Sequence, residues 1–270
     1  MTTALAPSDR VAQEQAPAPG LDPAAPYVSR LSARSALYTE LHQLLDAGRE
    51  LLPASAYRAL VIEENVLSSS SSAARLKLWK ELKSRYRLDG RDPLFADFWT
   101  EWKRCGSDAE RGLTCYVLLA LNDRLVADLG VVWLFALLRR APVEIRVADI
   151  LSFIDRAGTA RPEVRSWSPK TRLAVAQKYG ASIRDFGLAR GISRKTTVRP
   201  ALYASPVRLL VRALRRAGVS SLDLVQAPVF RLLALDTSEV IDALGELNRL
   251  GALRFRMQSD VVELDVTEGV

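Results

Sequence analysis

The most informative part of the chain is residues 168–199, which read SPKTRLAVAQKYGASIRDFGLARGISRKTTVR. Ser168 and Pro169 form an N-cap and first-turn pair, and apolar residues then recur at helical spacing as far as Phe186. The next residue is a glycine, which is typical of a helix end. Two short strands joined by a turn are expected to follow, over residues 188–190 and 196–199. The stretch therefore predicts a long helix followed by a small β-hairpin.

The predicted helix has an apolar arc and a polar arc when its residues are wound at about 100° per residue. The apolar arc holds Leu173, Val175, Ala176, Tyr179, Ile183 and Phe186. The opposite arc combines cationic and amide side chains with alanines, as a helix that enters the major groove of DNA requires. The candidate DNA contacts are Lys170, Thr171, Gln177, Lys178 and Arg184 on the helix and Arg190, Arg194, Lys195 and Arg199 on the hairpin. A basic surface helix without a partner remains an alternative.

Positive charge is concentrated around this helix. Residues 161–216 contain fourteen Lys or Arg and two acids, whereas the whole chain has a net charge of +7. The rest of the chain is therefore acidic. Such concentration is typical of a surface that binds polyphosphate, because each neutralised phosphate releases condensed counterions. The charge distribution favours a nucleic-acid partner over a solvated face that binds nothing.

The helix and hairpin belong to a longer order of elements. After Pro142 the pattern predicts a helix, a short helix, the long helix and the hairpin, which is the order of a winged helix-turn-helix. We expect four segments: a disordered Ala/Pro-rich tail over 1–26, an all-α bundle over 27–141, a basic winged-helix-like module over 142–202 and a second such module over 203–270. The fold class is therefore mainly α with short β-hairpins.

The second module repeats the order of elements but not the charge. Its third helix, expected over residues 238–250 behind an Asp236–Glu239 capping box, carries Glu239, Asp242 and Glu246 on its surface. Acidic side chains would repel a phosphate backbone. We therefore expect this module to pack or to bind protein.

The bundle is predicted from leucine spacing and helix punctuation. Leucines at three- and four-residue steps predict one helix from Leu31 to Leu52. Further helices are expected over residues 53–66, 73–88, 93–105, 108–121 and 123–140. The apolar stretch 113–138 resembles a membrane span in length, but Asn122, Asp123 and Arg124 lie in its middle. We therefore expect core helices and no membrane contact.

The sequence offers little for catalysis. The chain has one histidine, His42, inside a predicted helix, and two cysteines, Cys105 and Cys115. Neither a nucleophile motif nor a nucleotide-binding or metal-binding motif accompanies them. We expect no catalytic residue, no metal and no cofactor, and two cysteines without a disulfide framework fit the reducing cytoplasm.

Several segments resemble the BrxA family of bacteriophage-exclusion (BREX) defence loci. They are residues 61–67 (VIEENVL), the stretch 75–87, residues 167–171 (WSPKT), residues 185–188 (DFGL) and residues 218–220 (GVS). The resemblance runs from about Tyr27 to Val266. It implies a NusB-like helical N-terminal half and a non-enzymatic, cytoplasmic protein that binds double-stranded DNA. It also implies other BREX components as partners, in a system that methylates host DNA and blocks phage replication.

Three functions follow from these observations. The first is an accessory protein that binds duplex DNA through the basic helix and hairpin. The second is an adaptor that holds other components of the defence complex and has only incidental affinity for nucleic acid. The third is an RNA-binding protein, against which the lack of an aromatic-rich exposed sheet argues.

Overall fold

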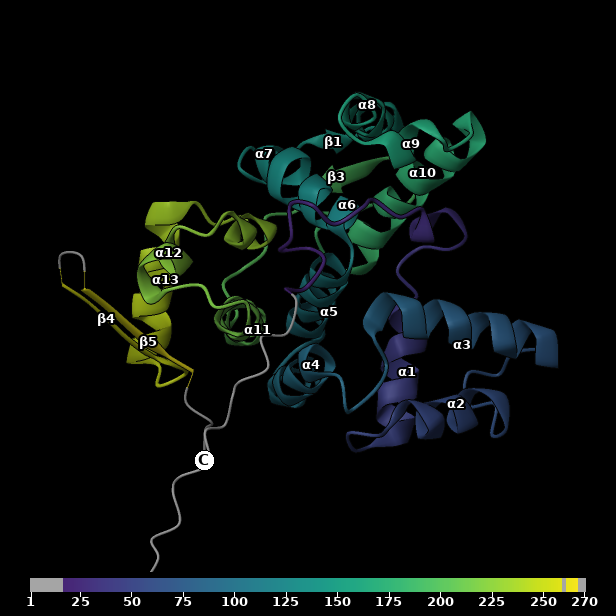
Figure 1. Ribbon diagram of the computed structural model, residues 1–270, viewed down its shortest axis with the longest axis horizontal. Coiled ribbons are helices and arrows are strands. Elements are labelled where there is room, and N and C mark those ends of the chain that lie inside the picture. Colours follow the sequence, from purple (N-terminus) through teal and green to yellow (C-terminus); the bar gives the residue numbers. More distant parts are fainter. Residues whose placement is uncertain (1–16, 259–260, 267–270) are drawn as a thin grey trace, which may run out of the picture.

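The computed structural model describes residues 17–258 and 261–266, and it is mainly helical, as the sequence predicts (Figure 1). Helix α5 runs through the middle of the molecule in this view. Helices α8 to α10 lie at its upper end, α1 to α3 at the lower right, and α12, α13 and a β-hairpin at the left. The finer expectations of a NusB-like bundle and of winged-helix modules stay predictions.

The N-terminal half contains η1 (Arg30–Ser32), α1 (Tyr38–Gly48), α2 (Ala54–Ile62), α3 (Ser72–Tyr86), α4 (Pro93–Arg104) and α5 (Asp108–Asn122). Side chains that accept a backbone N–H three residues later begin three of these helices: Ser71 for α3, Asp92 for α4 and Ser107 for α5. A continuous helical run then comprises α6 (Arg124–Asp128), the π-helical segment η2 (Leu129–Leu134) and α7 (Phe135–Leu138).

The single helix expected from Leu31 to Leu52 is wrong. Leu31 belongs to the 3-10 turn η1, and Leu37 adopts a left-handed conformation with φ of 57° just before α1. Both side chains are nevertheless buried. The leucine spacing therefore reports burial correctly but not a continuous helix, because turns also place apolar side chains in the core.

The middle of the chain contains β1 (Glu144–Ile145), α8 (Val147–Ala157), α9 (Pro162–Arg165), α10 (Pro169–Asp185), β2 (Ala189–Arg190) and β3 (Lys195–Thr197). The strands form an antiparallel sheet in the order β1-β3-β2. Arg190 lies opposite Thr196, and Glu144 lies on the other side of Thr196. The expected hairpin is thus present, and a third strand from before α8 joins it.

The last part contains α11 (Ala204–Arg216), α12 (Ser221–Val225), η3 (Pro228–Leu233), α13 (Thr237–Arg249), β4 (Arg254–Gln258) and β5 (Val261–Asp265). The predicted capping box is confirmed: Asp236 accepts the N–H of Glu239, and Glu239 accepts the N–H of Asp236. Strands β4 and β5 pair antiparallel, with Phe255 opposite Leu264.

One core runs through all three parts. Helix α11 packs against α4 and α5, and α10 packs against both α8 and η1. The apolar side chains of α11, among them Leu209 and Leu210, are fully buried in the same cluster as Phe98 of α4 and Val117 of α5. The boundaries expected at residues 141 and 202 therefore do not separate independent cores.

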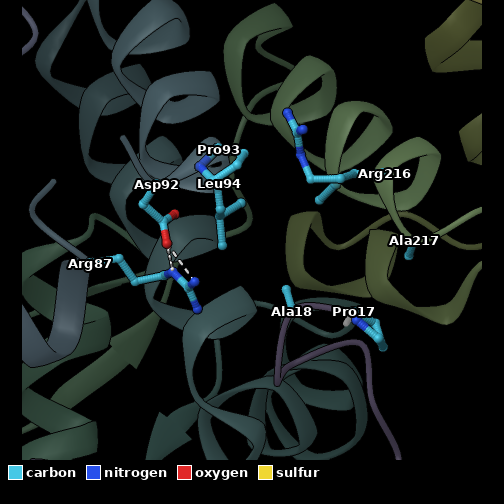
Figure 2. A pocket seen from close by; sticks show the side chains of 9 residues that line it. Pro17, Ala18, Arg87, Asp92, Pro93, Leu94, Arg216 and Ala217 are labelled. Carbon is cyan, nitrogen blue, oxygen red and sulfur yellow. Dashed lines mark hydrogen bonds and ion pairs between the residues drawn. The ribbon is translucent and has the colours of Figure 1, made fainter. Parts of the chain in front are cut away.

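The N-terminal segment is more ordered than expected. Residues 17–26, expected to belong to a disordered tail, pack on α5 and α6, whereas residues 1–16 lie outside the described residues. The N–H of Gly20 donates to Leu121 O at 2.8 Å, and Arg124 donates to Gly20 O at 3.1 Å. Figure 2 shows Pro17 and Ala18 facing the start of α4 and the end of α11.

Candidate nucleic-acid interface

Helix α10 starts and stops where its sequence predicts. Ser168 Oγ accepts the N–H of Thr171 at 3.1 Å, and Pro169 occupies the first turn. The helix ends at Asp185, and Gly187 follows with φ of 81°, a left-handed conformation that glycine adopts without strain. The chain then turns directly into β2.

The inner face of α10 is anchored in the core. Val175, Tyr179 and Ile183 are buried, and Gly180 lies against Ile150 of α8. The hydroxyls of Tyr179 and Tyr116 of α5 lie 3.4 Å apart. Burial raises the pKa of the Tyr179 hydroxyl well above its usual value, so this residue stays neutral. Helix α10 is thus a rigidly held element.

The outer face of α10 carries most of the expected contacts. Lys170 and Gln177 are exposed, and Thr171, Lys178 and Arg184 are half-buried at its edges. Ala174 and Ala181, also half-buried, lie between them on the same face and add little bulk. Leu173, expected on the apolar arc, is instead 40% exposed beside this face. The structure therefore brings the five helix residues to one side of α10.

The hairpin presents its cations at the tip. Arg190 and Arg194 are exposed, and Lys195 donates from Nζ to Ile192 O at 2.9 Å. Gly191 has φ of 95° and allows the tight turn, since a Cβ there would lie 2.1 Å from Arg194 O. Two of the four expected contacts, Arg190 and Arg194, are therefore exposed on the hairpin, and Lys195 is half-buried.

Arg199 does not belong to this surface. Its guanidinium binds Glu239 at 2.5 Å and also donates to Ala234 O at 3.4 Å. Arg139 binds the same carboxylate at 2.5 Å. Burial raises the pKa of Glu239, but its bonds to the Asp236 N–H and to both arginines outweigh this and hold the pKa below its usual value. Arg199 is thus engaged in fastening α13 to the rest of the protein.

The same bonds revise the acidic surface expected on α13. Glu239 is bound by Arg139 and Arg199, and Glu246 is ion-paired with Arg249. Of the three expected acids, only Asp242 is exposed without an ion-pair partner among the described residues. A continuous acidic stripe is therefore absent from α13, which the structure describes in full.

Many other cations of residues 161–216 have intramolecular partners. Arg172 binds Asp155 at 2.7 Å, Arg184 binds the adjacent Asp185 at 2.7 Å, and Arg208 binds Glu101 at 2.7 Å. Arg212 and Arg216 also pair with acids of α4, and Arg161 and Arg215 donate to main-chain oxygens. Much of the charge surplus is thus neutralised or engaged inside the fold.

Five cations of this range form no hydrogen bond or ion pair through their side chains with the residues that the structure describes. These free cations are Arg165, Lys170, Lys178, Arg190 and Arg194. All lie in α9, α10 or the β2–β3 hairpin. Sequence reasoning missed Arg165, although it falls within the basic range. It also missed Ile192, which is 79% exposed at the hairpin tip between Arg190 and Arg194.

The residues considered for catalysis are held in structural contacts. His42 Nδ1 lies 3.1 Å from the Asp46 carboxylate, and its ring packs edge-on against Trp102 at 5.2 Å. Burial raises the pKa of both the Cys105 and the Cys115 thiols, which disfavours the reactive thiolate. Among residues 17–258 and 261–266, no group of three His, Cys, Asp or Glu could hold a metal ion.

The length and hydropathy of the described helices bear on the expectation of no membrane contact. None of them is both long and apolar enough to cross a bilayer. The stretch 113–138 is divided between α5, α6, η2 and α7, and Asp123 caps α6 in the interior.

Comparison with known proteins identifies one family. A family model described as BrxA matches residues 25–213, which include α10 and the hairpin. No curated protein matches the chain.

Proposed function

Because this chain belongs to the BrxA family, which implies a role associated with BREX phage defence, we propose that it binds double-stranded DNA as a non-enzymatic accessory protein. The observation that carries the proposal is the exposed face of α10, where cations, an amide and two alanines share one side of a 17-residue helix. The free cations lie on this helix, just before it, or on the hairpin directly after it. Such a surface is suited to phosphate contacts with limited reading of bases.

The order of elements supports a winged-helix interpretation of this part. Helices α8, α9 and α10 precede the hairpin, and β1 lies beside β3. In helix-turn-helix proteins the later helix enters the major groove and the preceding helix crosses the backbone. Anchoring of α10 by Tyr179 and Ile183 favours this use, because a groove-binding helix must hold its side chains in a fixed register.

Each exposed residue has a defined role in the proposed complex. Lys170 and Lys178 contact phosphates, and Gln177 can donate to and accept from a base edge in the major groove. Arg190 and Arg194 reach the flanking backbone or minor groove, where Ile192 adds an apolar contact. Phosphate contacts outnumber base contacts, so binding is expected to depend strongly on salt and weakly on sequence.

The proposal is tested with Lys170→Glu combined with Lys178→Glu. Both side chains face away from the core, so the variant is expected to fold as the wild type does and to lose duplex binding. A matched control, Arg91→Glu with Lys103→Glu, makes the same charge change on exposed residues around α4. Fluorescence anisotropy with labelled duplex measures the affinity, and circular dichroism verifies the fold.

The salt dependence gives a second measure of the same proposal. With five or six phosphate contacts, the wild-type log–log slope is expected at roughly −4 to −6. A slope near zero, or undiminished binding by the Lys170/Lys178 variant, would show that α10 does not contact DNA. Competition by RNA stronger than that by duplex DNA would favour the RNA-binding alternative.

An adaptor function is a second candidate, and one observation favours it. Leu250, Met257 and Val261 are exposed by 69%, 42% and 66%, and they belong to the end of α13 and to the β4–β5 hairpin. Met257 pairs with Val262 and Val261 pairs with Gln258, so the two exposed apolar side chains lie on opposite faces of the hairpin, and either face could contact a protein partner. If Met257→Ser with Val261→Ser removes phage resistance but leaves duplex affinity intact, the adaptor function holds in addition to DNA binding.

A further inference from the structure

Helix α3 carries a second basic surface, separate from α10 and the β2–β3 hairpin. Its lysine stripe consists of Lys77, Lys80 and Lys83, all exposed, and the inner face of the helix packs against α2 and α5. None of these ammonium groups forms an ion pair with a described residue, and Lys83 lies 5.9 Å from the centroid of the Trp79 ring. The stripe is therefore free to meet an external anion.

The charge of this stripe is not cancelled within the helix. Glu81 is the single acid of α3, and it is ion-paired with the fully buried Arg85. Arg75 turns its guanidinium back to Ile62 O at 2.7 Å. The outer face thus presents three lysines with no acid of α3 opposing them.

A groove joins the lysine stripe to the start of α10. Its lining includes Lys80, Ser84 and Glu81 of α3, of which Glu81 is ion-paired with Arg85, together with Arg30 and Ser32 of η1 and with Trp167, which directly precedes the N-cap of α10. Its volume is ≈ 700 Å³. Figure 1 shows the purple segment around η1 between α10 above and α3 below. The two basic surfaces are therefore neighbours separated by a single groove.

We propose that duplex DNA held on α10 and the β2–β3 hairpin continues across this groove, so that its phosphate backbone also contacts the lysine stripe of α3. This inference rests on the proposed DNA binding by α10. The occupant is assigned as DNA because Trp167, which lines the groove, stands in the chain between the free cations Arg165 and Lys170, and because lysine is a suitable point-charge donor to phosphate. The N-terminal bundle would then take part in binding by extending the footprint.

The footprint determines the design of the test. Helix α10 is about 25 Å long at 1.5 Å per residue, which is shorter than the roughly 34 Å of one DNA turn. A 10-bp duplex therefore covers the length of α10, whereas a 24-bp duplex, about 80 Å long, extends well past the helix and gives DNA that can continue onto α3. The variant is Lys77→Glu with Lys80→Glu in the full chain, and the control is Arg91→Glu with Lys103→Glu.

On the 24-bp duplex, the α3 variant is expected to bind on the order of tenfold more weakly than the control, with a salt slope shallower by about 2. On the 10-bp duplex it should bind within twofold of the control. The inference is overturned if the α3 variant equals the control on both duplexes, or if it loses the same affinity on both. The Lys170/Lys178 variant tests the proposed function on its own. If that variant loses binding, DNA binding by α10 holds even when the inference about α3 fails. If that variant keeps binding, DNA binding by α10 is refuted.

Discussion

At the residue scale, whether an arginine is free or ion-paired decides whether its side chain can contact DNA. An arginine whose guanidinium already binds a carboxylate must break that pair before it can reach a phosphate. Arg199 is in this position, because Glu239 holds it at 2.5 Å. Arg194 forms no such bond with the described residues, and its side chain is exposed.

The first residue-scale prediction separates these two arginines. Arg199→Ala should leave duplex affinity within twofold of the wild type and lower the free energy of unfolding by roughly 0.5–1 kcal/mol, since the ion pair is partly exposed. Arg194→Ala should weaken binding severalfold without a change in stability. Anisotropy titrations and urea denaturation measure the two effects. The opposite pattern would return Arg199 to the DNA-binding surface.

A second residue-scale feature is a buried carboxyl group. Asp123 caps α6 by accepting the N–H groups of Leu125 and Val126, and it is 2% exposed. Burial raises its pKa to about 6, although Arg30 and Arg85 act in the opposite direction. Its protonated form is therefore favoured in the folded state more than in the unfolded chain, where the usual value is 3.8.

The pH dependence of stability follows from that shift. Protonation of Asp123 contributes about 3 kcal/mol, which is fully present below pH 3.8 and is lost as the pH rises through about 6. Asn keeps the cap but does not titrate. The stability of the wild type relative to Asp123→Asn should therefore fall between pH 5 and pH 7, as measured by urea denaturation at each pH. A constant difference over this range would show that Asp123 titrates as it does in water.

At the element scale, capping residues close to the helix ends were sufficient to predict where most helices begin. The caps Ser71, Asp92, Ser107 and Ser168 each begin the helix that the sequence places after them. The Asp236–Glu239 box was likewise predictable, because both partners are three residues apart. Such signals involve neighbouring residues only, so they can be recognised from the sequence without knowledge of the tertiary structure.

Features that depend on distant residues could not be predicted in this way. The pairing of Arg199 with Glu239 joins positions 40 apart, and that of Arg208 with Glu101 joins positions 107 apart. A charge count along the chain therefore overstated the basic surface around α10. The basic surface of α3, by contrast, was predictable from the sequence, since residues 75–87 hold six cations and one acid.

The N-terminal strap, residues 17–26, gives the element-scale prediction. A Cβ on Gly20 would lie 2.1 Å from Ala120 O, and the other two nearest atoms also belong to the backbone of Ala120 and Leu121, which cannot move aside easily. Gly20→Ala should therefore release the strap from α5 and lower the free energy of unfolding by about 1–3 kcal/mol. Duplex affinity should not change, because the strap contributes no exposed cation to α10. Denaturation and anisotropy measure the two quantities, and unchanged stability would mean that the strap is not packed in solution.

At the scale of the whole molecule, a buried ion network ties the first helices to the last part of the chain. Glu101 of α4 is fully buried and binds Arg208 at 2.7 Å and Arg212 at 3.4 Å, both on α11, together with Arg104 at 3.3 Å. Three cations thus depend on one carboxylate in the interior. Because α11 also packs its leucines between α4 and α5, the chain is expected to unfold as a unit despite its modular order of elements.

The final prediction tests this unity. Glu101→Gln removes the charge that compensates buried Arg208 and should lower the free energy of unfolding by about 3–5 kcal/mol. Asp97→Asn, which breaks the more exposed pair with Arg216, should cost less than about 1 kcal/mol. All five tryptophans precede residue 168, so their fluorescence reports unfolding of the N-terminal half and of the segment up to α10. Far-UV circular dichroism also reports unfolding of α11 and α13. Both signals should show one transition, shifted together in Glu101→Gln. Two separate transitions, of which Glu101→Gln moved only the fluorescence signal, would instead show that residues 203–270 fold independently.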